Sequence, residues 1–325
     1  MKIVFFGTPF FAAKCLDKIF KKHQVLGIVT GIDKPQGRGK KNQFSEVKKH
    51  AIENNIQLFQ QSNMQDVKFI KKLKALEADL FIVVAFKKIP KEVWSIPSKG
   101  TINLHASLLP EYRGAAPINW AIINGEKTTG ITTFFINDKI DCGDIILKEK
   151  INITKTTTAA QLHQEMIQKG SDLLLKTISK IEKDKITKII QNYKSEYKKA
   201  PKLTKEICRI QWNEDCKKIY NKIRGLSPVI DDIKIEKDIS IFPAAWSIID
   251  NKKKKIKVKI YESEYELKKH DLNAGEIITD NKKELKISSK KGFIIVKKIQ
   301  IESKKIMDIK SFLNGYKIGT SSKFI

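Results

Sequence analysis

Apolar runs alternate with amphipathic segments along the first 190 residues of the chain. An unbroken apolar run at 2–6 precedes a segment, 10–22, whose apolar residues recur at helical spacing. A second run, Val25–Thr30, leads into a polar, Gly-rich loop at 31–42. Further helices are expected at 45–54, 66–77 and 157–184, and further strands at 56–59, 79–86, 101–105, 130–136 and 144–151. Strands without a polar face that alternate with helices predict an α/β fold, a mostly parallel sheet with helices on both faces.

The pattern changes after about residue 190 to short strands separated by polar turns. Residues 191–205 are polar, basic and contain proline, as expected of a linker. A short helix is expected at 214–224, and brief strands are expected at 256–261, 275–279, 284–289 and 292–301. Short strands with Lys-, Gly- and Asn-rich turns are typical of a small β-barrel. The expected domains are therefore 1–189 and 206–325, joined by a linker at 190–205.

Bulk composition bounds the class of protein. Of the 325 residues 41% are apolar, and no run approaches the roughly 18–20 apolar residues of a membrane span. The four cysteines lie far apart without a C-x-x-C pair, which indicates reduced thiols rather than disulfides or a zinc site. The sequence therefore predicts a cytoplasmic protein with no membrane partner. No feature demands a dimer, so a monomer is expected.

The net charge of +27 is carried almost entirely by lysine, with 59 lysines against four arginines. Part of this charge reflects a compositional bias, yet a chain this basic attracts polyanions with a salt-dependent affinity. Where lysine is the default, a retained arginine indicates a position that uses a planar guanidinium group, although chance is the competing interpretation. The four arginines are Arg38, Arg113, Arg209 and Arg224.

Polar residues mark the end of the strand expected at 101–105. Strand alternation points Asn103 and His105 to the same side, at the carboxyl end where ligands bind in open α/β sheets. Asp141 follows in a turn between two later strands. Without a Ser or Cys nucleophile, this set suits a direct transfer. The amide and the imidazolium can stabilise an oxyanion, while the carboxylate orients the imidazole. A structural histidine is the competing interpretation of His105 taken alone.

A longer string around these residues resembles the formyltransferase family. Its members share an Asn-x-His sequence, a Ser-Leu-Leu-Pro-x-x-Arg-Gly loop and an aspartate in an Asp-x-Gly-Asp turn. This chain carries them at 103–105, 107–114 and 141–144, with 36 residues from His105 to Asp141. The resemblance implies a Rossmann-like sheet that binds 10-formyltetrahydrofolate, followed by a small OB-like β-barrel domain.

The resemblance also implies a role for each residue of the string. Asn103 and a protonated His105 would hold the tetrahedral oxyanion that forms when the substrate amine attacks the formyl carbon. Asp141 would tune His105 and help to move the proton from that amine, and no metal is required. The folate ring would lie against backbone near residues 84–88 and 140–144. The expected folate-binding residues are Phe86, Ser107, Leu108, Leu109 and Pro110.

Three further segments favour those family members that formylate methionyl-initiator-tRNA. The loop at 30–41 interleaves Gly and Pro with cations and is similar to the loop by which these enzymes grip the acceptor stem. The opening segment Gly7–Ala12 is similar to the family's opening, and residues 200–212 resemble the start of its tRNA-binding barrel. The expected tRNA-binding residues are Arg38, Lys40 and Lys41. A solvated charge run is the competing interpretation of that loop.

The sequence departs from the family pattern in two places, and two alternative functions remain open. An insertion at Val229–Phe242 is expected to extend a surface loop of the barrel, and Phe86-Lys87-Lys88 replaces the usual Tyr-Gly after the strand at 79–86. One alternative is a formyltransferase for an aminosugar nucleotide, which would need no basic barrel. The other is an RNA-binding relative without catalysis, against which the intact Asn–His–Asp set argues.

Overall fold

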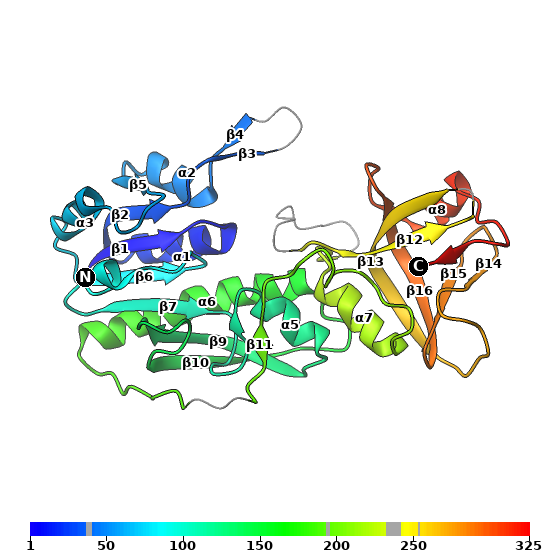
Figure 1. The fold of residues 1–325 in the computed structure, drawn as a ribbon. Helices are drawn as coiled ribbons and strands as arrows, with labels where there is room; N and C mark the ends of the chain where they lie inside the picture. Colours follow the sequence, from blue (N-terminus) through cyan, green and yellow to red (C-terminus); the bar gives the residue numbers. More distant parts are fainter. Residues whose placement is uncertain (37–40, 193–195, 232–241, 253) are drawn as a thin grey trace. The chain divides into compact units, whose positions relative to one another are not determined.

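The computed structural model describes residues 1–36, 41–192, 196–231, 242–252 and 254–325, which pack into two compact units (Figure 1). The first unit comprises Met1–Gly114, Thr129–Ile151 and Glu165–Lys199, and the second comprises Ala115–Thr128, Asn152–Gln164 and Ala200–Ile325. The expected domains, 1–189 and 206–325 with a linker at 190–205, follow chain order and remain a prediction. The packing units instead assign two short earlier segments to the second unit.

A seven-stranded sheet forms the centre of the first unit. Its strands are β1 (Lys2–Gly7), β2 (Gln24–Thr30), β5 (Leu58–Gln60), β6 (Leu80–Val84), β7 (Thr101–His105), β9 (Thr128–Phe135) and β10 (Ile145–Asn152). They lie in the order β10-β9-β7-β6-β1-β2-β5. Neighbours from β7 through β5 are parallel, while β9 runs antiparallel to β7. The mostly parallel sheet that the unbroken apolar runs predict is confirmed.

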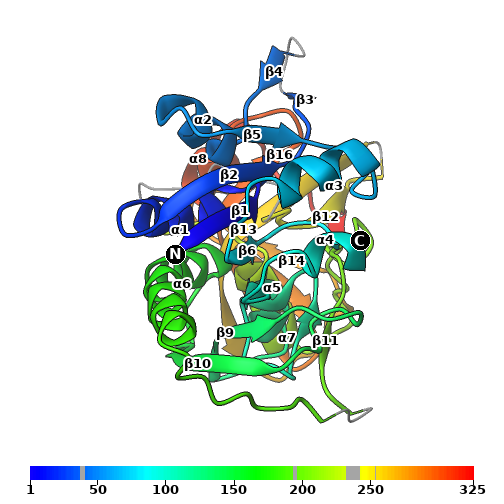
Figure 2. The same cartoon turned by 90° about the vertical axis from the view of Figure 1, so that its left-hand side faces the viewer.

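Helices cover both faces of this sheet (Figure 2). The helices are α1 (Phe10–Phe20), α2 (Glu46–Glu53), α3 (Val67–Lys74), α4 (Lys91–Trp94) and α6 (Ala159–Glu182). On one face Phe6 of β1 packs into a core with Leu73 of α3 and Val93 of α4. On the other, Thr133 of β9 hydrogen-bonds Thr177 of α6 over 2.8 Å. Like the other helices in the described ranges, α6 lacks the apolar character that a membrane crossing needs.

Short elements account for the main differences from the expected pattern. Residues 34–36 (β3) and 41–43 (β4) form an antiparallel pair within the segment expected to be a loop at 31–42. Backbone pairing does not need apolar side chains, so the loop prediction was wrong at 34–36 and 41–42. Three short helices were not expected because they span too few residues to show a helical period: α4, α5 (Pro117–Ile123) and α8 (Ile309–Gly315).

The second unit is built on an antiparallel sheet that closes on itself. Its strands are β12 (Ala245–Asp250), β13 (Lys255–Leu267), β14 (Ile277–Thr279), β15 (Leu285–Ser289), β16 (Gly292–Ile301), β17 (Met307–Asp308) and β18 (Lys323–Phe324). They lie in the order β14-β15-β16-β13-β12-β18, with β17 paired to β16. A bridge between Glu276 and Lys323 joins the two ends of this order. The expected small β-barrel is confirmed, and most of the insertion at Val229–Phe242 lies outside the described residues.

Trp212, near the start of the barrel sequence, is part of the barrel interior. Trp212 is buried and donates its indole N–H to Ser247 Oγ over 2.9 Å. Its ring packs edge-on against Phe324, with the centroids 5.3 Å apart. The helix α7 (Cys216–Gly225) follows and buries Ile219 and Ile223 in the same core. Trp212 is therefore an anchor of the barrel core rather than a ligand contact.

Gly275 is required where the barrel closes. Its φ is +87°, and a Cβ added there would lie 2.1 Å from the carbonyl oxygen of Phe324. The two residues pair through a hydrogen bond from Phe324 N–H to Gly275 O over 2.8 Å. Gly275→Ala is expected to lower the free energy of unfolding by about 2 kcal/mol or more, measured in urea. Gly315→Ala is the control, because a Cβ added at that position would meet no atom within 4 Å. Equal effects of the two changes would contradict this explanation.

Candidate active site

The side chains of Asn103 and His105 lie at the carboxyl end of β7. Both belong to the same face of the strand because alternate side chains of a strand point the same way. The strand is held in register on both sides: Asn103 lies opposite Val83 of β6, and His105 lies opposite Thr132 of β9. His105 is buried and Asn103 is half-buried. The structure thus brings these two predicted residues to one end of the central sheet.

The hydrogen bonds of His105 indicate which ring nitrogen is available for chemistry. Its Nε2 lies 2.9 Å from the carbonyl oxygen of Tyr112. A carbonyl only accepts hydrogen bonds, so Nε2 carries the proton in the neutral ring. Nδ1 then faces the Asp141 carboxylate, with Oδ2 3.9 Å away. Nδ1 is thus the ring nitrogen on the Asp141 side, while Nε2 is engaged by the Tyr112 carbonyl.

Asp141 is fixed by the turn that carries it. Its backbone has a φ of +55°, and its Oδ2 accepts a hydrogen bond from the N–H of Gly114 over 3.0 Å. The turn is packed tightly, because a Cβ added at Gly143 would lie 1.6 Å from the carbonyl oxygen of Phe135. Phe135 in turn donates its N–H to Asp144 O over 2.9 Å. Backbone packing and a hydrogen bond to the carboxylate together hold the side chain toward His105.

The side-chain amide of Asn103 has an oxygen that is available to bind a ligand. Its Oδ1 is buried and finds no hydrogen-bond partner among the described residues. An unsatisfied buried amide oxygen is unfavourable by about 1–3 kcal/mol unless a ligand supplies the missing bond. Rotation about χ2 lets the same amide present its NH₂ instead. A reacting group that offers a donor or an oxyanion at this point would fit the site.

A hydrogen-bond network shapes the loop that follows β7. The buried hydroxyl of Thr132 donates to Ser107 O over 2.7 Å and accepts from Leu109 N–H over 3.1 Å. The hydroxyl of Ser107 donates to Glu111 O over 2.6 Å. Lys148 of β10 donates to Leu109 O over 2.5 Å, and partial burial of its ammonium group lowers its pKa. Thr132 and Lys148 were not among the expected site residues.

The expected folate-binding residues differ in what they can present to a ligand. Ser107 and Leu109 are fully buried, whereas Leu108 and Pro110 are half-buried. Phe86 follows β6 at the same edge of the sheet, but its ring packs edge-on against Phe6 with the centroids 5.9 Å apart. The structure therefore leaves backbone near Phe86, and the side chains of Leu108 and Pro110, as the surfaces that could meet a ring.

The expected tRNA-binding residues belong to a different part of the chain. Arg38 and Lys40 lie outside the described residues, and Lys41 begins β4, where its backbone pairs with Gln36. Nearby, Asp33 accepts hydrogen bonds from Lys48 and Gln60, and these bonds lower the pKa of the Asp33 carboxyl. The base of the β3–β4 pair is thus tied to α2 and β5.

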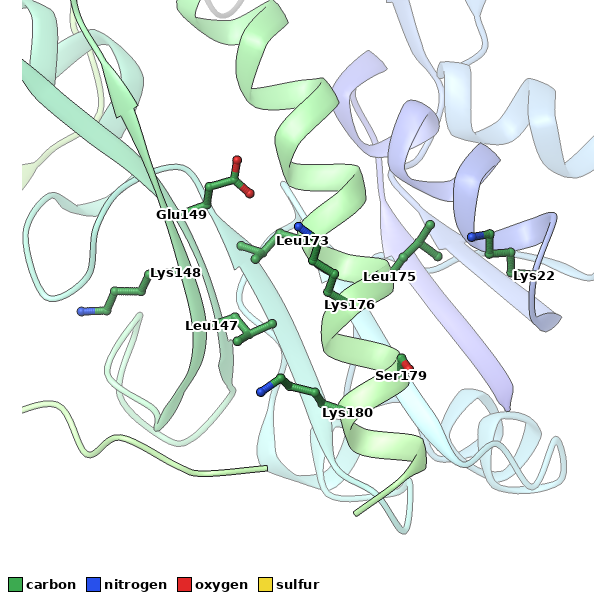
Figure 3. A pocket seen from close by; sticks show the side chains of 9 residues that line it. All are labelled: Lys22, Leu147, Lys148, Glu149, Leu173, Leu175, Lys176, Ser179 and Lys180. Atoms are coloured by element: carbon green, nitrogen blue, oxygen red, sulfur yellow. The ribbon is translucent and has the colours of Figure 1, made fainter. Parts of the chain in front are cut away.

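Asn103, His105 and Asp141 form the cluster at the end of β7. An open groove of about 710 Å³ lies apart from this cluster, between α6 and β10 (Figure 3). Its lining residues are Lys22, Leu147, Lys148, Glu149, Leu173, Leu175, Lys176, Ser179 and Lys180. None of the predicted site residues lines it. Its cations are lysines on α6, on β10 and just after α1, and the Lys148 side chain in Figure 3 extends away from α6. The groove lacks the histidine and amide groups that suit the predicted transfer, so the cluster at β7 is the stronger candidate.

Comparison with known proteins accounts for both units. Residues 1–178 match the Formyl transferase family, and residues 202–317 match the Formyl transferase C-terminal domain. The chain belongs to the formyltransferase family. It is 45% identical over 324 residues to the methionyl-tRNA formyltransferase of Flavobacterium johnsoniae, covering 99% of this chain and 98% of the relative. The enzyme of that name from Bacteroides thetaiotaomicron is 41% identical over 328 residues, covering 99% and 98%.

Solved structures of low sequence identity share the fold. The sugar 3N-formyltransferase WlaRD, solved in the presence of dTDP and 5-N-formyl-THF, is 21% identical with a TM-score of 0.63 and covers 94% of this chain and 99% of its own. HypX from Aquifex aeolicus, solved with tetrahydrofolic acid, is 18% identical with a TM-score of 0.60. It covers 96% of this chain and 46% of its own. The fold of this formyltransferase is thus shared with proteins of low sequence identity.

Proposed function

We propose that this formyltransferase transfers the formyl group of 10-formyltetrahydrofolate to the amino group of methionyl-initiator-tRNA in the cytoplasm. The observation that carries the chemistry is the approach of His105 Nδ1 to Asp141 Oδ2, at 3.9 Å, beside the unsatisfied Asn103 amide. The observation that supports the acceptor is full-length similarity to proteins named methionyl-tRNA formyltransferase, barrel included.

The chemistry requires one bond to form and one to break. The amine nitrogen of the methionyl group attacks the formyl carbon, and the carbonyl oxygen becomes an oxyanion. Asn103, through its NH₂, and His105, through Nδ1–H, stabilise that oxyanion. The bond from the formyl carbon to the folate nitrogen then breaks. Overall the amine loses one proton and the folate nitrogen gains one, and in this proposal Asp141 receives and returns it.

The loop after β7 supplies the donor surface in this proposal. Leu108 and Pro110 present half-buried apolar side chains to the folate ring, and the backbone near Phe86 offers hydrogen-bonding groups. Ser107 and Leu109 contribute through the loop's shape, since both are fully buried. Two structural relatives were solved with folate compounds, 5-N-formyl-THF and tetrahydrofolic acid, which supports a donor of this class.

A competition between acceptors tests the proposal. The formyltransferase would receive a limiting amount of 10-formyltetrahydrofolate together with methionyl-initiator-tRNA and a dTDP-linked aminosugar. Formyl groups are expected on the methionine of the tRNA. Preferential formylation of the sugar would favour the alternative acceptor, to which the fold shared with WlaRD gives structural support. Folate binding without transfer to either acceptor would favour a relative without catalysis.

Arg38→Ala is expected to weaken use of the tRNA acceptor. Loss of one guanidinium contact to phosphate is expected to raise KM for methionyl-tRNA about 5- to 10-fold and to reduce the salt dependence of binding by about one charge. KM for the folate donor should not change. Lys22→Ala, which removes an exposed cation of the same unit, is the matched control. An equal rise of both KM values in Arg38→Ala would argue against the role of this loop.

A further inference from the structure

The segment before residue 193 runs beside the turn that carries Asp141. Ile189 and Ile145 exchange both backbone hydrogen bonds, with Ile145 N–H to Ile189 O at 2.8 Å and Ile189 N–H to Ile145 O at 2.9 Å. The pairing is antiparallel, so moving two residues forward from Ile189 corresponds to moving two residues back from Ile145. This register places Gln191 opposite Gly143, within reach of the turn.

The carboxamide of Gln191 uses its donors and its acceptor on both sides of the site. Its Nε2 donates to Gly143 O over 2.7 Å and to Asp141 O over 3.2 Å. Its Oε1 accepts from Arg113 Nη2 over 2.7 Å. Arg113 immediately precedes Gly114, whose N–H holds the Asp141 carboxylate. One half-buried side chain therefore ties the Asp141 backbone to the loop that binds the Asp141 side chain.

We propose that Gln191 is a positioning residue that holds the Asp141 carboxylate beside His105. This inference rests on the proposed role of Asp141. A neutral amide is the group that fits, because it offers two N–H donors to carbonyls and an oxygen to a guanidinium at the same time. Asp141 adopts a φ of +55°, a conformation that needs support from its surroundings. Without the amide, the turn and the Arg113–Gly114 loop lose a link that supports the hydrogen bond from Gly114 N–H to the Asp141 carboxylate.

The first test is a double-mutant cycle on formyl transfer by the full-length protein. Gln191→Ala is expected to lower kcat about 10- to 100-fold with KM for donor and acceptor nearly unchanged. Gln191→Glu keeps the shape and the Arg113 contact but loses the donors, so a similar loss is expected. Asp141→Gly removes the carboxylate and suits the positive φ. In that background Gln191→Ala should change kcat less than about twofold.

Asn192→Ala, which removes the exposed neighbouring amide, is the control and should keep wild-type kcat. Equal losses from Gln191→Ala in the wild-type and Asp141→Gly backgrounds would overturn the inference, because the two residues would then act independently. Wild-type kcat in Gln191→Glu would overturn it as well, since shape alone would suffice.

The second test does not depend on activity. Hydrogen exchange of the Gly114 amide, followed by NMR, reports whether the Asp141 carboxylate stays in place. We expect Gly114 exchange to accelerate about 10-fold or more in Gln191→Ala, toward the rate in Asp141→Gly, and to stay unchanged in Asn192→Ala. Wild-type exchange in Gln191→Ala would contradict the positioning role. A wild-type protein that transfers no formyl group would defeat the proposed function, yet this measurement would still decide the role of Gln191.

Discussion

Replacing His105 with alanine is expected to lower kcat for formyl transfer about 10³-fold. The change removes a group that would hold the oxyanion, along with the nitrogen that faces Asp141 Oδ2 at 3.9 Å. Methionyl-tRNA affinity should remain close to the wild-type value, because the side chain is buried at a strand end rather than on a basic surface. Single-turnover rates with both substrates saturating, together with tRNA binding, measure the two effects separately.

His50 provides a matched control for that experiment. It is a half-buried histidine whose Nε2 lies 3.0 Å from Asp17 Oδ1, so it too has an aspartate partner. It lies on α2 and takes no part in the cluster at the end of β7. His50→Ala should change thermal stability more than kcat. A kcat for His105→Ala within about threefold of the wild-type value would contradict the mechanism.

Asp141→Asn is expected to lower kcat about 10²- to 10³-fold without unfolding the turn. Asparagine tolerates a positive φ and keeps an oxygen that can accept from Gly114 N–H, so the change removes mainly the charge. The loss should appear in kcat, because the carboxylate acts on the proton that leaves the amine. Steady-state kinetics with each substrate varied in turn separates this effect from a change in KM.

Asp138→Asn serves as the control for the loss of charge. Asp138 is exposed and lies three residues before Asp141 on the same connection, so its loss changes the charge of the region without touching the site. We expect wild-type kcat in this variant. If Asp138→Asn and Asp141→Asn reduced kcat equally, the effect would belong to the net charge of the region rather than to a carboxylate at the site.

Local patterns in the sequence were enough to place His105 and Asn103. The alternation of side chains in the 101–105 strand put both residues on one face, and the register with β6 and β9 agrees with that placement. The unbroken apolar run at 79–86 likewise predicted a buried strand, although β6 ends at Val84 and Ala85 adopts a φ of +48°. The alternation of a strand is encoded locally, which is why these features could be predicted.

The contacts that hold the site could not be predicted, because they join residues distant in sequence. Thr132 is one of four threonines in β9, so the sequence does not show that its hydroxyl is the one that bonds Ser107 and Leu109. Gln191 falls in a stretch whose composition indicates a linker, and only the tertiary pairing of Ile189 with Ile145 brings it to the site. The composition of a segment does not show which other segment it pairs with in the fold.

The four arginines were predictable in part: the sequence shows that they are scarce, but not which groups they contact. Arg113 bonds Gln191, and Arg209 lies over the Trp246 ring at 5.5 Å. Buried Arg224 donates to Thr157 O over 2.8 Å and to Asn221 over 2.9 Å. Arg224 uses the multiply donating group that lysine lacks, whereas Lys257 also lies over the Trp246 ring, at 5.4 Å. Arg38 lies outside the described residues, so its contact with tRNA remains a prediction.

Formyl transfer to methionyl-tRNA is the measurement that decides the central claim. Purified protein would be mixed with 10-formyltetrahydrofolate, labelled in the formyl carbon, and with either initiator or elongator methionyl-tRNA. We expect labelled formylmethionine to appear on the initiator tRNA at a rate well above that on the elongator. Protein that binds the folate donor yet forms no labelled formylmethionine on either tRNA would contradict the claim.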